Sequence, residues 1–302
     1  MFKTIGILII TLILIGSIPN ISLAAEQSQK DVSGDSTIFY WQEKEYQEQY
    51  KNLFSELEEK GFTRWELNKI FYNSRVEYYP ALFKKPKPEA EKPEKKDYTE
   101  FLLNKSSIQN GRDFLTEHDS LQQSVETIYG PEPEILTSIF RIETNFGKNT
   151  GGSYRIFNVF NTIFLLHWKE DKQDWARREL IVWLVLCKEK GWNPFTYGSS
   201  AGAFGYSQFL PSSYQAYAVD GNNDGKIDLF NWADAHHSVA NYLDKHGWKK
   251  DDWVKNSYAI RSYNRSWFFY VDPVGIYASK VSFDPEYRGR LPVSSTARFL
   301  KK

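Results

Sequence analysis

One glutamate, Glu143, stands in this sequence where a helix should carry only apolar side chains. Residues 133–147 read PEILTSIFRIETNFG, and the Pro near the start and the Gly at the end predict a helix. At 100° per residue, Glu143 lies about 80° from Ile135, in the middle of the apolar face. That face is formed by Ile135, Leu136, Ile139, Phe140 and Ile142. The other side is expected to hold Glu134, Thr137, Ser138 and Arg141.

A carboxylate on an apolar face has two physical solutions. It can form a buried ion pair with Lys or Arg, or it can stay protonated with a raised pKa, because burying its charge alone costs too much. The second solution provides a general acid near neutral pH, which is how glycosidases use such a group. The acidic residues between Glu143 and Asp220 lie mostly in polar helical surroundings: Glu170, Asp171, Asp174, Glu179 and Glu189. Glu143 is therefore the candidate acid, with the ion pair as the alternative.

Residues 220–228, which read DGNNDGKID, match the opening of an EF-hand calcium loop. Positions 1, 3 and 5 carry oxygen-bearing side chains, position 6 is Gly, and position 7 offers a backbone carbonyl. Position 12 is Asn231 rather than the usual Glu, and Asp234 would supply the missing carboxylate in a longer loop, 220–234. The predicted ligands of one structural Ca²⁺ ion are therefore Asp220, Asn222, Asp224, Lys226 and Asp234. A metal-free Asx turn is the alternative.

A stretch of small residues at 198–213, which reads GSSAGAFGYSQFLPSS, lies between these two features. Small residues let a backbone approach another helix or a ligand closely. No Lys stands at P-loop spacing, so a phosphate-binding loop is not indicated. Composition alone favours a structural role for this stretch.

The elements that position these groups are expected to be mostly helices, with few and short strand signals and no internal repeat. In the N-terminal segment 39–79, Thr63-Arg64-Trp65-Glu66 predicts a capping box at the start of a short helix. The inward positions there are predicted to be Leu53, Leu57, Phe62, Leu67 and Phe71. Residues 84–97, KKPKPEAEKPEKKD, carry no hydrophobic pattern and predict a linker or exposed loop.

Composition and the first residues indicate an exported globular protein. Aromatic residues make up 17% of the 302, which suits deep cores or grooves that stack sugar rings. The formal net charge is zero, so nothing points to nucleic acid or an anionic bilayer as a partner. Lys3, an apolar run over 5–15 and small residues up to Ala25 predict a signal peptide over 1–25, with an uncleaved anchor as the alternative. The single cysteine, Cys187, is expected to be a buried, inert thiol.

Several of these motifs together resemble the lytic murein transglycosylases of the B type. They are, in order, 142–147 (IETNFG), 202–214 (GAFGYSQFLPSSY), the acidic loop, 238–242 (SVANY), 246–248 (HGW) and Tyr263-Asn264. The likeness extends back to Tyr98 and weakly into the N-terminal segment. After Tyr263 the family carries another Tyr six residues on, but here Phe269 takes that position and Tyr270 follows, so no role is assigned to either.

The resemblance implies a mainly α fold: a lysozyme-like transglycosylase domain over 98–302 with the EF-hand-like calcium loop 220–234, preceded by an N-terminal helical region and linker over 26–97. It places Glu143 at the catalytic glutamate of the family. It implies that the residues binding or orienting the glycan are Tyr98, Ser199, Gln208, Tyr242 and Tyr263. Calcium is expected to be structural, and no organic cofactor is expected.

The function implied by the resemblance is that of a periplasmic, monomeric lytic transglycosylase acting on peptidoglycan glycan strands. Such an enzyme cleaves the MurNAc-β-1,4-GlcNAc bond without water and leaves 1,6-anhydro-MurNAc ends. Two alternatives stay open. A hydrolytic muramidase would use the same Glu143 with a positioned water or a second acid. A non-catalytic, calcium-bound peptidoglycan-binding protein would keep the aromatic residues without using the acid.

Overall fold

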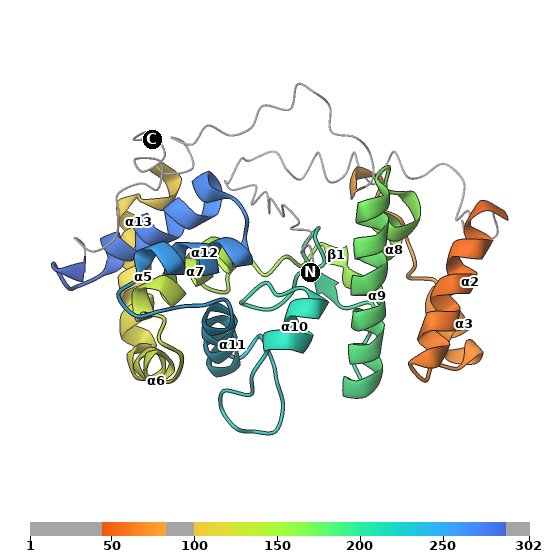
Figure 1. The fold of residues 1–302 in the computed structure, drawn as a ribbon, viewed down its shortest axis with the longest axis horizontal. Helices are drawn as coiled ribbons and strands as arrows, with labels where there is room; N and C mark the ends of the chain where they lie inside the picture. Colours follow the sequence, from red (N-terminus) through yellow and green to blue (C-terminus); the bar gives the residue numbers. More distant parts are fainter. Residues whose placement is uncertain (1–43, 83–99, 288–302) are drawn as a thin grey trace. The chain divides into compact units, whose positions relative to one another are not determined.

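The computed structural model describes residues 44–82 and 100–287, and it is built mainly of helices (Figure 1). These residues form two compact units. The larger unit comprises 100–156 and 196–287, and the smaller unit comprises 44–82 and 157–195. The predicted mainly α fold is confirmed.

The smaller unit is built from four α-helices and one short 3₁₀ turn. They are α2 (Lys44–Glu59), α3 (Arg64–Phe71), η2 (Pro80–Leu82), α8 (Ile156–Leu166) and α9 (Glu170–Lys190). All five predicted inward positions are buried: Leu53, Leu57, Phe62, Leu67 and Phe71. Their burial at helical spacing anchors α2 and α3 in the core of this unit.

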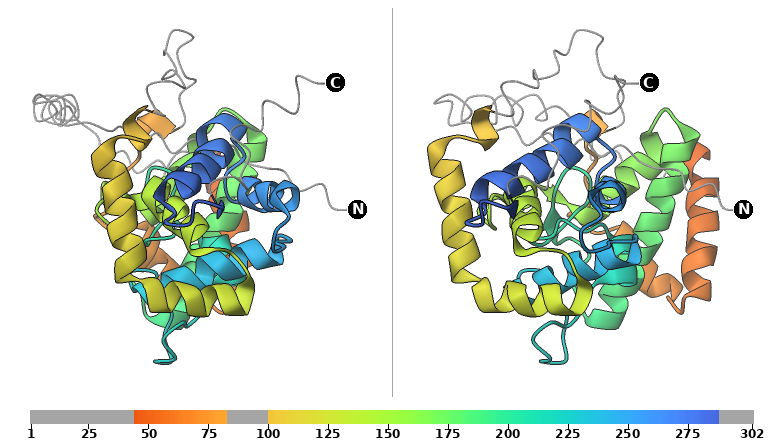
Figure 2. Two further views of the ribbon diagram at one scale, coloured as in Figure 1. Left: turned by 90° about the vertical axis from the view of Figure 1, so that its left-hand side faces the viewer. Right: turned by 60° about the vertical axis from the view of Figure 1, so that its left-hand side comes forward.

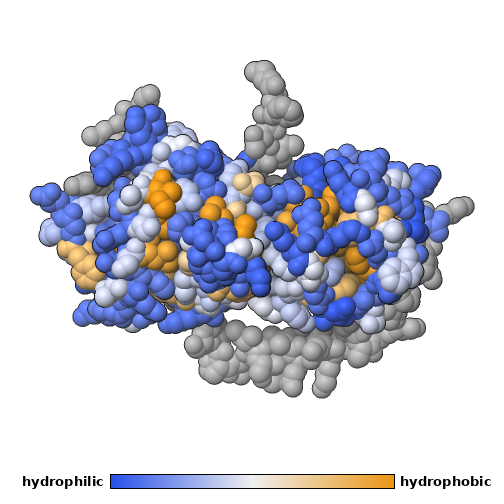
Figure 3. All heavy atoms as spheres, turned by 90° about the horizontal axis from the view of Figure 1, so that it is seen from below, coloured by the Kyte–Doolittle hydropathy of each residue, from blue (hydrophilic) through white to orange (hydrophobic). Residues whose placement is uncertain are grey.

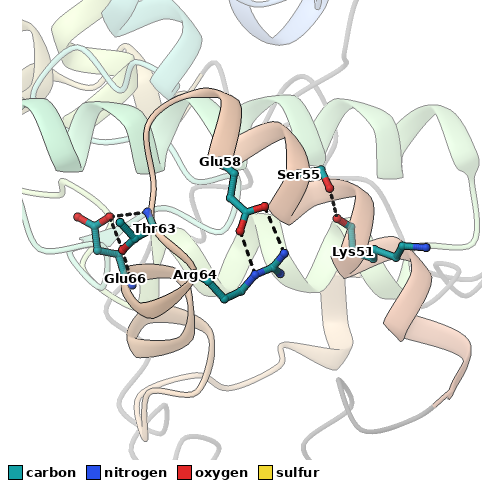
Figure 4. A network of polar contacts seen from close by, with 6 residues as sticks. All are labelled: Lys51, Ser55, Glu58, Thr63, Arg64 and Glu66. Atoms are coloured by element: carbon teal, nitrogen blue, oxygen red, sulfur yellow. Dashed lines mark hydrogen bonds and ion pairs between the residues drawn. The ribbon is translucent and has the colours of Figure 1, made fainter.

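The predicted capping box at the start of α3 is present (Figure 4). The Thr63 N–H donates to Glu66 Oε2 at 2.7 Å, and the Glu66 N–H donates to Thr63 Oγ1 at 3.2 Å. Arg64 forms an ion pair with Glu58 of α2, with Nε 2.9 Å from Oε1. The cap satisfies two backbone donors at the helix start, and the ion pair links α3 to α2.

The structure groups residues 157–195 with the N-terminal helices, whereas the sequence places them in a domain that spans 98–302. The ion pair between Arg177 of α9 and Glu56 of α2 is one of the contacts that join them. Residues 1–25, predicted as a signal peptide, and the predicted linker 84–97 lie outside the described residues. The boundary at residue 97 therefore stays a prediction.

The larger unit surrounds one central helix, α7 (Pro133–Thr144), with other helices (Figure 2). These are α5 (Lys105–Glu117), α6 (Asp119–Tyr129), α10 (Pro211–Tyr217), α11 (Trp232–Lys245), α12 (Trp253–Tyr263), the π-helical turn η3 (Trp267–Val271) and α13 (Asp272–Val281). Strands β1 (Tyr154–Arg155) and β2 (Tyr197–Gly198) form a short antiparallel pair, with Tyr154 opposite Gly198. Helices α5, α6, α11 and α13 all contact α7.

Helix α7 is buried on every side from Ile135 to Thr144. Its polar side, which the sequence distinguishes from the apolar face, is therefore also inside the unit. Its hydroxyl and guanidinium groups find partners there: Gln122 Nε2 donates to Thr137 Oγ1 at 3.0 Å, and Arg141 Nε donates to Ser107 Oγ at 2.9 Å. These hydrogen bonds offset the cost of burying the polar side chains of this helix.

The helix ends three residues before the predicted Gly147. Asn145 and Phe146 both adopt left-handed backbone conformations, with φ of 50° and 60°. Asn tolerates this conformation better than most residues and closes helices in this way. The turn places Glu143 one residue before the last residue of α7.

Cys187 lies on α9 and is buried, with 4% of its surface exposed. Burial raises the pKa of its thiol well above the usual range. The prediction of an inert, buried thiol is confirmed.

The surface of both units is mostly hydrophilic on the face shown in Figure 3, with smaller apolar areas between the polar ones. Large apolar side chains that are exposed include Trp65, Trp168, Phe268 and Phe283. Among the described residues, no helix is both long and apolar enough to cross a bilayer.

Candidate active site

The candidate site centres on the carboxyl group of Glu143, which is 9% exposed. Burial raises the pKa of Glu143 to about 7, and a hydrogen bond from Tyr270 opposes part of this shift. The Tyr270 hydroxyl donates to Glu143 Oε1 at 2.6 Å. No Lys or Arg of the described residues forms an ion pair with Glu143. Of the two solutions that the sequence left open, the structure has the protonatable acid and not the ion pair.

Tyr270 is the residue of the site that the sequence analysis left without a role. It is 2% exposed and belongs to η3, where the Val271 N–H donates to the carbonyl of Ser266 five residues earlier, at 3.1 Å. A π-helical turn holds one more residue than an α-helical turn. We attribute the position of Tyr270 to this extra residue. With it, the Tyr that lies seven residues after Tyr263 reaches the carboxyl group of Glu143. The only sign of this in the sequence was that Tyr270 stands one residue after the position, 269, at which the family carries a Tyr.

Two predicted glycan-binding residues, Tyr242 and Tyr263, lie in a row of rings that leads to Glu143. The Tyr242 ring centroid lies 4.8 Å from that of Tyr263, and the Tyr263 ring stacks at 6.1 Å on Tyr270. The ring centroid of Phe209 lies 5.8 Å from that of Tyr242 and 5.8 Å from that of Tyr263. The structure thus brings residues from α11, α12 and η3 together beside the end of α7.

The hydroxyl groups of Tyr242 and Tyr263 both donate to backbone carbonyls. Tyr242 donates to Ser262 at 2.7 Å, and Tyr263 donates to Ser207. The pKa of Tyr263 is raised, first by burial and then by the charges of Glu143 and Tyr242. These bonds fix the ring positions, and the phenols stay protonated near neutral pH.

Gln208 stands in a turn that needs its small neighbours. Its backbone is left-handed, with φ of 48°, and its Nε2 donates to Gly205 O at 2.8 Å and to Thr150 O at 3.1 Å. A Cβ atom on Gly205, whose φ is 76°, would lie 2.3 Å from Cβ of Leu229. The amide nitrogen of Gln208 is therefore used to hold the turn, which leaves its amide oxygen for other contacts.

Ser199 lies at the start of the same stretch. Its Oγ accepts from Ala203 N at 3.1 Å and from Ala201 N at 3.3 Å, so the side chain also stabilises its own turn. No hydrogen bond joins Ser199 to Glu143. Tyr98 lies outside the described residues, so its predicted place at the groove edge stays a prediction.

Comparison with known proteins assigns most of this chain to a family. The family described as Transglycosylase SLT domain matches residues 45–256. This chain belongs to that family. Glu143 lies within the matched part of the SLT domain, and Tyr263 and Tyr270 lie just beyond it.

Three relatives of this SLT-domain chain are lytic transglycosylases. Membrane-bound lytic murein transglycosylase B of Escherichia coli (strain K12) is 35% identical over 158 residues, which cover 52% of this chain and 43% of that protein. The match thus spans less than half the length of this relative. Soluble lytic transglycosylase SltB1 from Pseudomonas aeruginosa has a TM-score of 0.69 at 26% identity, covering 80% of this chain and 99% of that one.

The third relative is the E. coli lytic transglycosylase Slt35. Its structure in complex with bulgecin A has a TM-score of 0.70 at 24% identity, covering 80% of this chain and 94% of that one. Its structure in complex with calcium has a TM-score of 0.70 at 23% identity, with the same coverage. At these identities the likeness to Slt35 shows the shared fold. The resemblance inferred from the sequence motifs is confirmed by the family match.

The acidic loop of the SLT-domain chain folds into successive turns. Asp220 accepts from Gly225 N at 2.8 Å, Asn222 accepts from Asp224 N at 3.0 Å, and Asp224 accepts from Lys226 N at 2.9 Å. The Asn222 amide also donates to Asp224 Oδ2 at 3.1 Å. Within the described residues, no three His, Cys, Asp or Glu side chains come close enough to hold a metal ion. The predicted ligands would offer three carboxylates, one amide oxygen and the backbone carbonyl of Lys226, which is oxygen chemistry of the kind Ca²⁺ prefers.

Asp234 joins this loop to α11. It is 1% exposed, and its two oxygens accept from Gly221 N at 2.8 Å and from Asp228 N at 2.7 Å. Asn231, at position 12 of the loop, caps α11 by accepting from Ala233 N at 2.8 Å. Asp234 therefore holds both ends of the loop, and its predicted role as a direct calcium ligand stays a prediction.

Proposed function

We propose that this chain is a lytic transglycosylase that cleaves the MurNAc-β-1,4-GlcNAc bond of peptidoglycan without water and leaves 1,6-anhydro-MurNAc ends. Membership of the SLT-domain family and the likeness to three lytic transglycosylases support it. The observation that carries the proposal is the buried Glu143 with a pKa of about 7, bonded to Tyr270. Such a group is protonated in a large fraction of molecules at neutral pH and can both give and take a proton.

The reaction needs one carboxyl group that acts twice. Protonated Glu143 donates its proton to the oxygen between MurNAc and GlcNAc, and the bond from that oxygen to C1 of MurNAc breaks. The 2-acetamido group of MurNAc stabilises the positive charge that develops at C1. Carboxylate Glu143 then takes the proton of the 6-hydroxyl of the same sugar, and O6 bonds to C1. Atoms and charges balance, and no water is consumed.

The surroundings of Glu143 favour this route over hydrolysis by two carboxylates. In the described part of the chain, no second carboxylate contributes to the pKa of Glu143, which is set by burial and Tyr270. A pair of carboxyl groups about 5–10 Å apart is what ordinary glycosidases use, and such a neighbour would raise the pKa further. One buried acid with no carboxylate beside it in the described part of the chain is the arrangement that a substrate-assisted, water-free reaction uses.

Tyr270 is part of the proposed mechanism as a positioning residue. Its hydroxyl orients the Glu143 carboxyl group and stabilises the carboxylate that forms after proton donation. Tyr242 and Tyr263 are proposed to bind or orient the glycan beside it, together with Gln208, Ser199 and Tyr98. The row of rings from Tyr242 to Tyr270 supports this for Tyr242 and Tyr263.

Calcium binding by the acidic loop is the second part of the proposal. Asp220, Asn222 and Asp224 would supply side-chain oxygens and Lys226 a backbone carbonyl. Asp234 would complete the set through the lone pairs that its two amide bonds leave open. The structure of Slt35 in complex with calcium supports this. The metal would hold the loop onto α11, the helix that carries Tyr242, and would take no part in the chemistry.

The organisation of the chain and its place in the cell belong to the same proposal. Residues 1–25 would direct export to the periplasm, and 26–97 would form the N-terminal helical region and linker before the transglycosylase domain. The name of the E. coli relative as a membrane-bound murein enzyme supports a location at the cell wall.

The proposed function is tested by replacing Glu143 with Gln. This change is nearly isosteric and removes the proton that the reaction needs. The rate at which muropeptides are released from purified peptidoglycan should therefore fall by about 10²–10⁴-fold. Glu189→Gln, which removes an exposed carboxylate on α9, is the matched control and should keep full activity. Release by the Glu143 variant at the rate of the control would show that another group is the acid.

A further inference from the structure

One segment of the larger unit, 253–271, carries positive charge and aromatic rings but no carboxylate. It forms α12, η3 and the turn between them, and it contains no Asp or Glu. Its basic residues are Lys255, Arg261 and Arg265. The same segment holds Tyr263 and Tyr270, whose rings stack beside Glu143. In a chain with a formal net charge of zero, positive charge is therefore concentrated next to the proposed site of cleavage.

Helix α12 buries one side and leaves the other exposed. The buried residues are Asn256, Ser257, Ala259 and Ile260. Tyr258 is 52% exposed, and Arg261, three residues on, lies only about 60° from it around the helix. The partly exposed ring of Trp267 in η3 meets both side chains. Its centroid lies 5.5 Å from that of Tyr258 and 5.4 Å from Cζ of Arg261, so the three side chains form one surface cluster.

The guanidinium group of Arg261 has no anion to balance it. No Asp or Glu among the described residues forms an ion pair with it, and its buried Nε–H has no acceptor there. The Trp267 ring attracts the cation without neutralising its charge, and a stacked guanidinium can still donate through its edge. Lys255 differs, because its ammonium group lies 3.5 Å from the carboxylate of Asp252. A carboxylate is the ligand that an unbalanced guanidinium binds best, through two parallel N–H bonds.

Arg265 extends this charge towards the row of rings beside Glu143. It stands in the turn between α12 and η3, where the Ser266 N–H donates to Asn264 Oδ1 at 3.2 Å. Arg265 likewise has no ion pair within the part of the chain that the structure describes. Burial raises the pKa of Tyr242, and the charge of Arg265 opposes this rise. Arg265 therefore acts electrostatically on the residues proposed to hold the glycan.

We propose that Arg261 and Arg265, with the rings of Trp267 and Tyr258, bind the peptide stem of a peptidoglycan strand through its carboxylates. This inference rests on the proposed function and names the part of the substrate that gives specificity. A stem leaves the muramyl sugar at its lactyl group, so a sugar held at Tyr263 presents its stem to the same segment. A stem carries carboxylates at several points along its length, which suits two separate guanidinium groups. A glycan strand without stems offers only the lactyl carboxylate of each muramyl sugar.

Titration calorimetry with three soluble tetrasaccharides tests this proposal. The first is two GlcNAc-MurNAc units with their peptide stems, the second is the same sugar chain with the stems removed, and the third is the neutral tetramer of N-acetylglucosamine. The protein carries Glu143→Gln, so that no ligand is cut. The stem-bearing tetrasaccharide should bind at least about tenfold more tightly than either of the others, because hydrogen bonds between charged groups are strong enough for this difference.

Two results would overturn the proposal. Equal binding of the stem-bearing and stem-free tetrasaccharides, both tighter than the neutral tetramer, would assign the anion to the lactyl group and overturn the stem assignment. Equal binding of all three would overturn the carboxylate site itself.

Variants made in the Glu143→Gln protein locate the site. Arg261→Gln and Arg265→Gln should each weaken binding of the stem-bearing tetrasaccharide about tenfold and leave binding of the neutral tetramer unchanged, which also shows that the fold is intact. Arg261→Lys should recover part of the loss, because it keeps the charge without the paired N–H bonds. Trp267→Leu should weaken stem binding about two- to fivefold, since it removes the ring that holds the guanidinium. Lys255→Gln is the matched control: it removes a positive charge from the same helix, but that charge is already balanced, so binding should not change.

Stem binding and cleavage fail separately. If the arginine variants lose stem binding but the wild type cuts no glycan, the stem site stands and the proposed function is wrong. If the wild type cuts glycan and the arginine variants bind all three tetrasaccharides like the Glu143→Gln protein, the stem site is wrong and the proposed function stands. The second result would leave this surface to a protein partner, for which exposed Trp, Tyr and Arg side chains are also typical.

Discussion

Replacing Glu143 with Gln should change the free energy of unfolding differently at pH 4 and at pH 8. Relative to the wild type, the variant should be about 3 kcal/mol more stable at pH 8 than it is at pH 4. In the folded protein, burial raises the pKa of Glu143 from 4.5 to about 7. In the unfolded chain the carboxyl group has its ordinary pKa, so it ionises first as the pH rises. Ionisation therefore favours the unfolded state, and the wild type loses stability between about pH 4.5 and pH 7.

The magnitude follows from the size of the shift. About 2.5 pKa units at about 1.4 kcal/mol each give a loss of about 3 kcal/mol by pH 8, and almost none at pH 4. Gln cannot ionise, so the variant lacks this loss. Any cost of placing the Gln amide beside Tyr270 is the same at both pH values and cancels in the difference.

Urea unfolding of the wild type and of Glu143→Gln at pH 4 and pH 8 measures this difference. The exposed Glu189→Gln is the control, and its effect should differ by less than about 0.5 kcal/mol between the two pH values. The two units can unfold separately, so the transition of the larger unit is followed on its own. An effect of Glu143→Gln that is equal at both pH values, or larger at pH 4, would refute the raised pKa.

Three further predictions concern the neighbours of Glu143 and the acidic loop. Tyr270→Phe removes the donor that favours charged Glu143, so the alkaline limb of the pH–rate profile should move up by about one unit, while Tyr263→Phe leaves it in place; a limb that does not move would contradict this bond. Calcium at a hundredfold excess over its dissociation constant should stabilise the protein by about 2.7 kcal/mol in thermal melts after EDTA treatment, and Asp220→Ala should lose this gain; a midpoint indifferent to calcium would leave the loop as a turn only. Gly205→Ala should lower the free energy of unfolding in urea by about 2 kcal/mol or more, because the new Cβ would meet Leu229. Gly61→Ala, where φ has the same sign and the space is open, should lower it by about 1 kcal/mol. Equal losses would mean that the contact with Leu229 relaxes.

The sequence predicted the features that depend on local periodicity. The helix that carries Glu143 and the burial of this residue, the capping box at Thr63 and the inward positions of α2 and α3 all follow from helical spacing over a few residues. Each is confirmed because neighbours along one helix share the same geometry wherever the helix is placed.

The features that were missed depend on contacts between distant segments. Tyr270 lies 127 residues from Glu143, and its place depends on a π-helical turn that no local pattern announces. The polar side of α7 is buried because Gln122 and Ser107 supply partners from α6 and α5.

The central claim is that Glu143 cuts glycan strands without consuming water. Purified peptidoglycan is digested with the wild-type protein, treated with borohydride to reduce any reducing ends, and analysed by mass spectrometry. The proposed reaction predicts muramyl ends that are one water lighter than hydrolytic ends and that borohydride does not reduce, with none produced by Glu143→Gln. Reducible muramyl ends as the main product would contradict the claim and make the protein a hydrolytic muramidase.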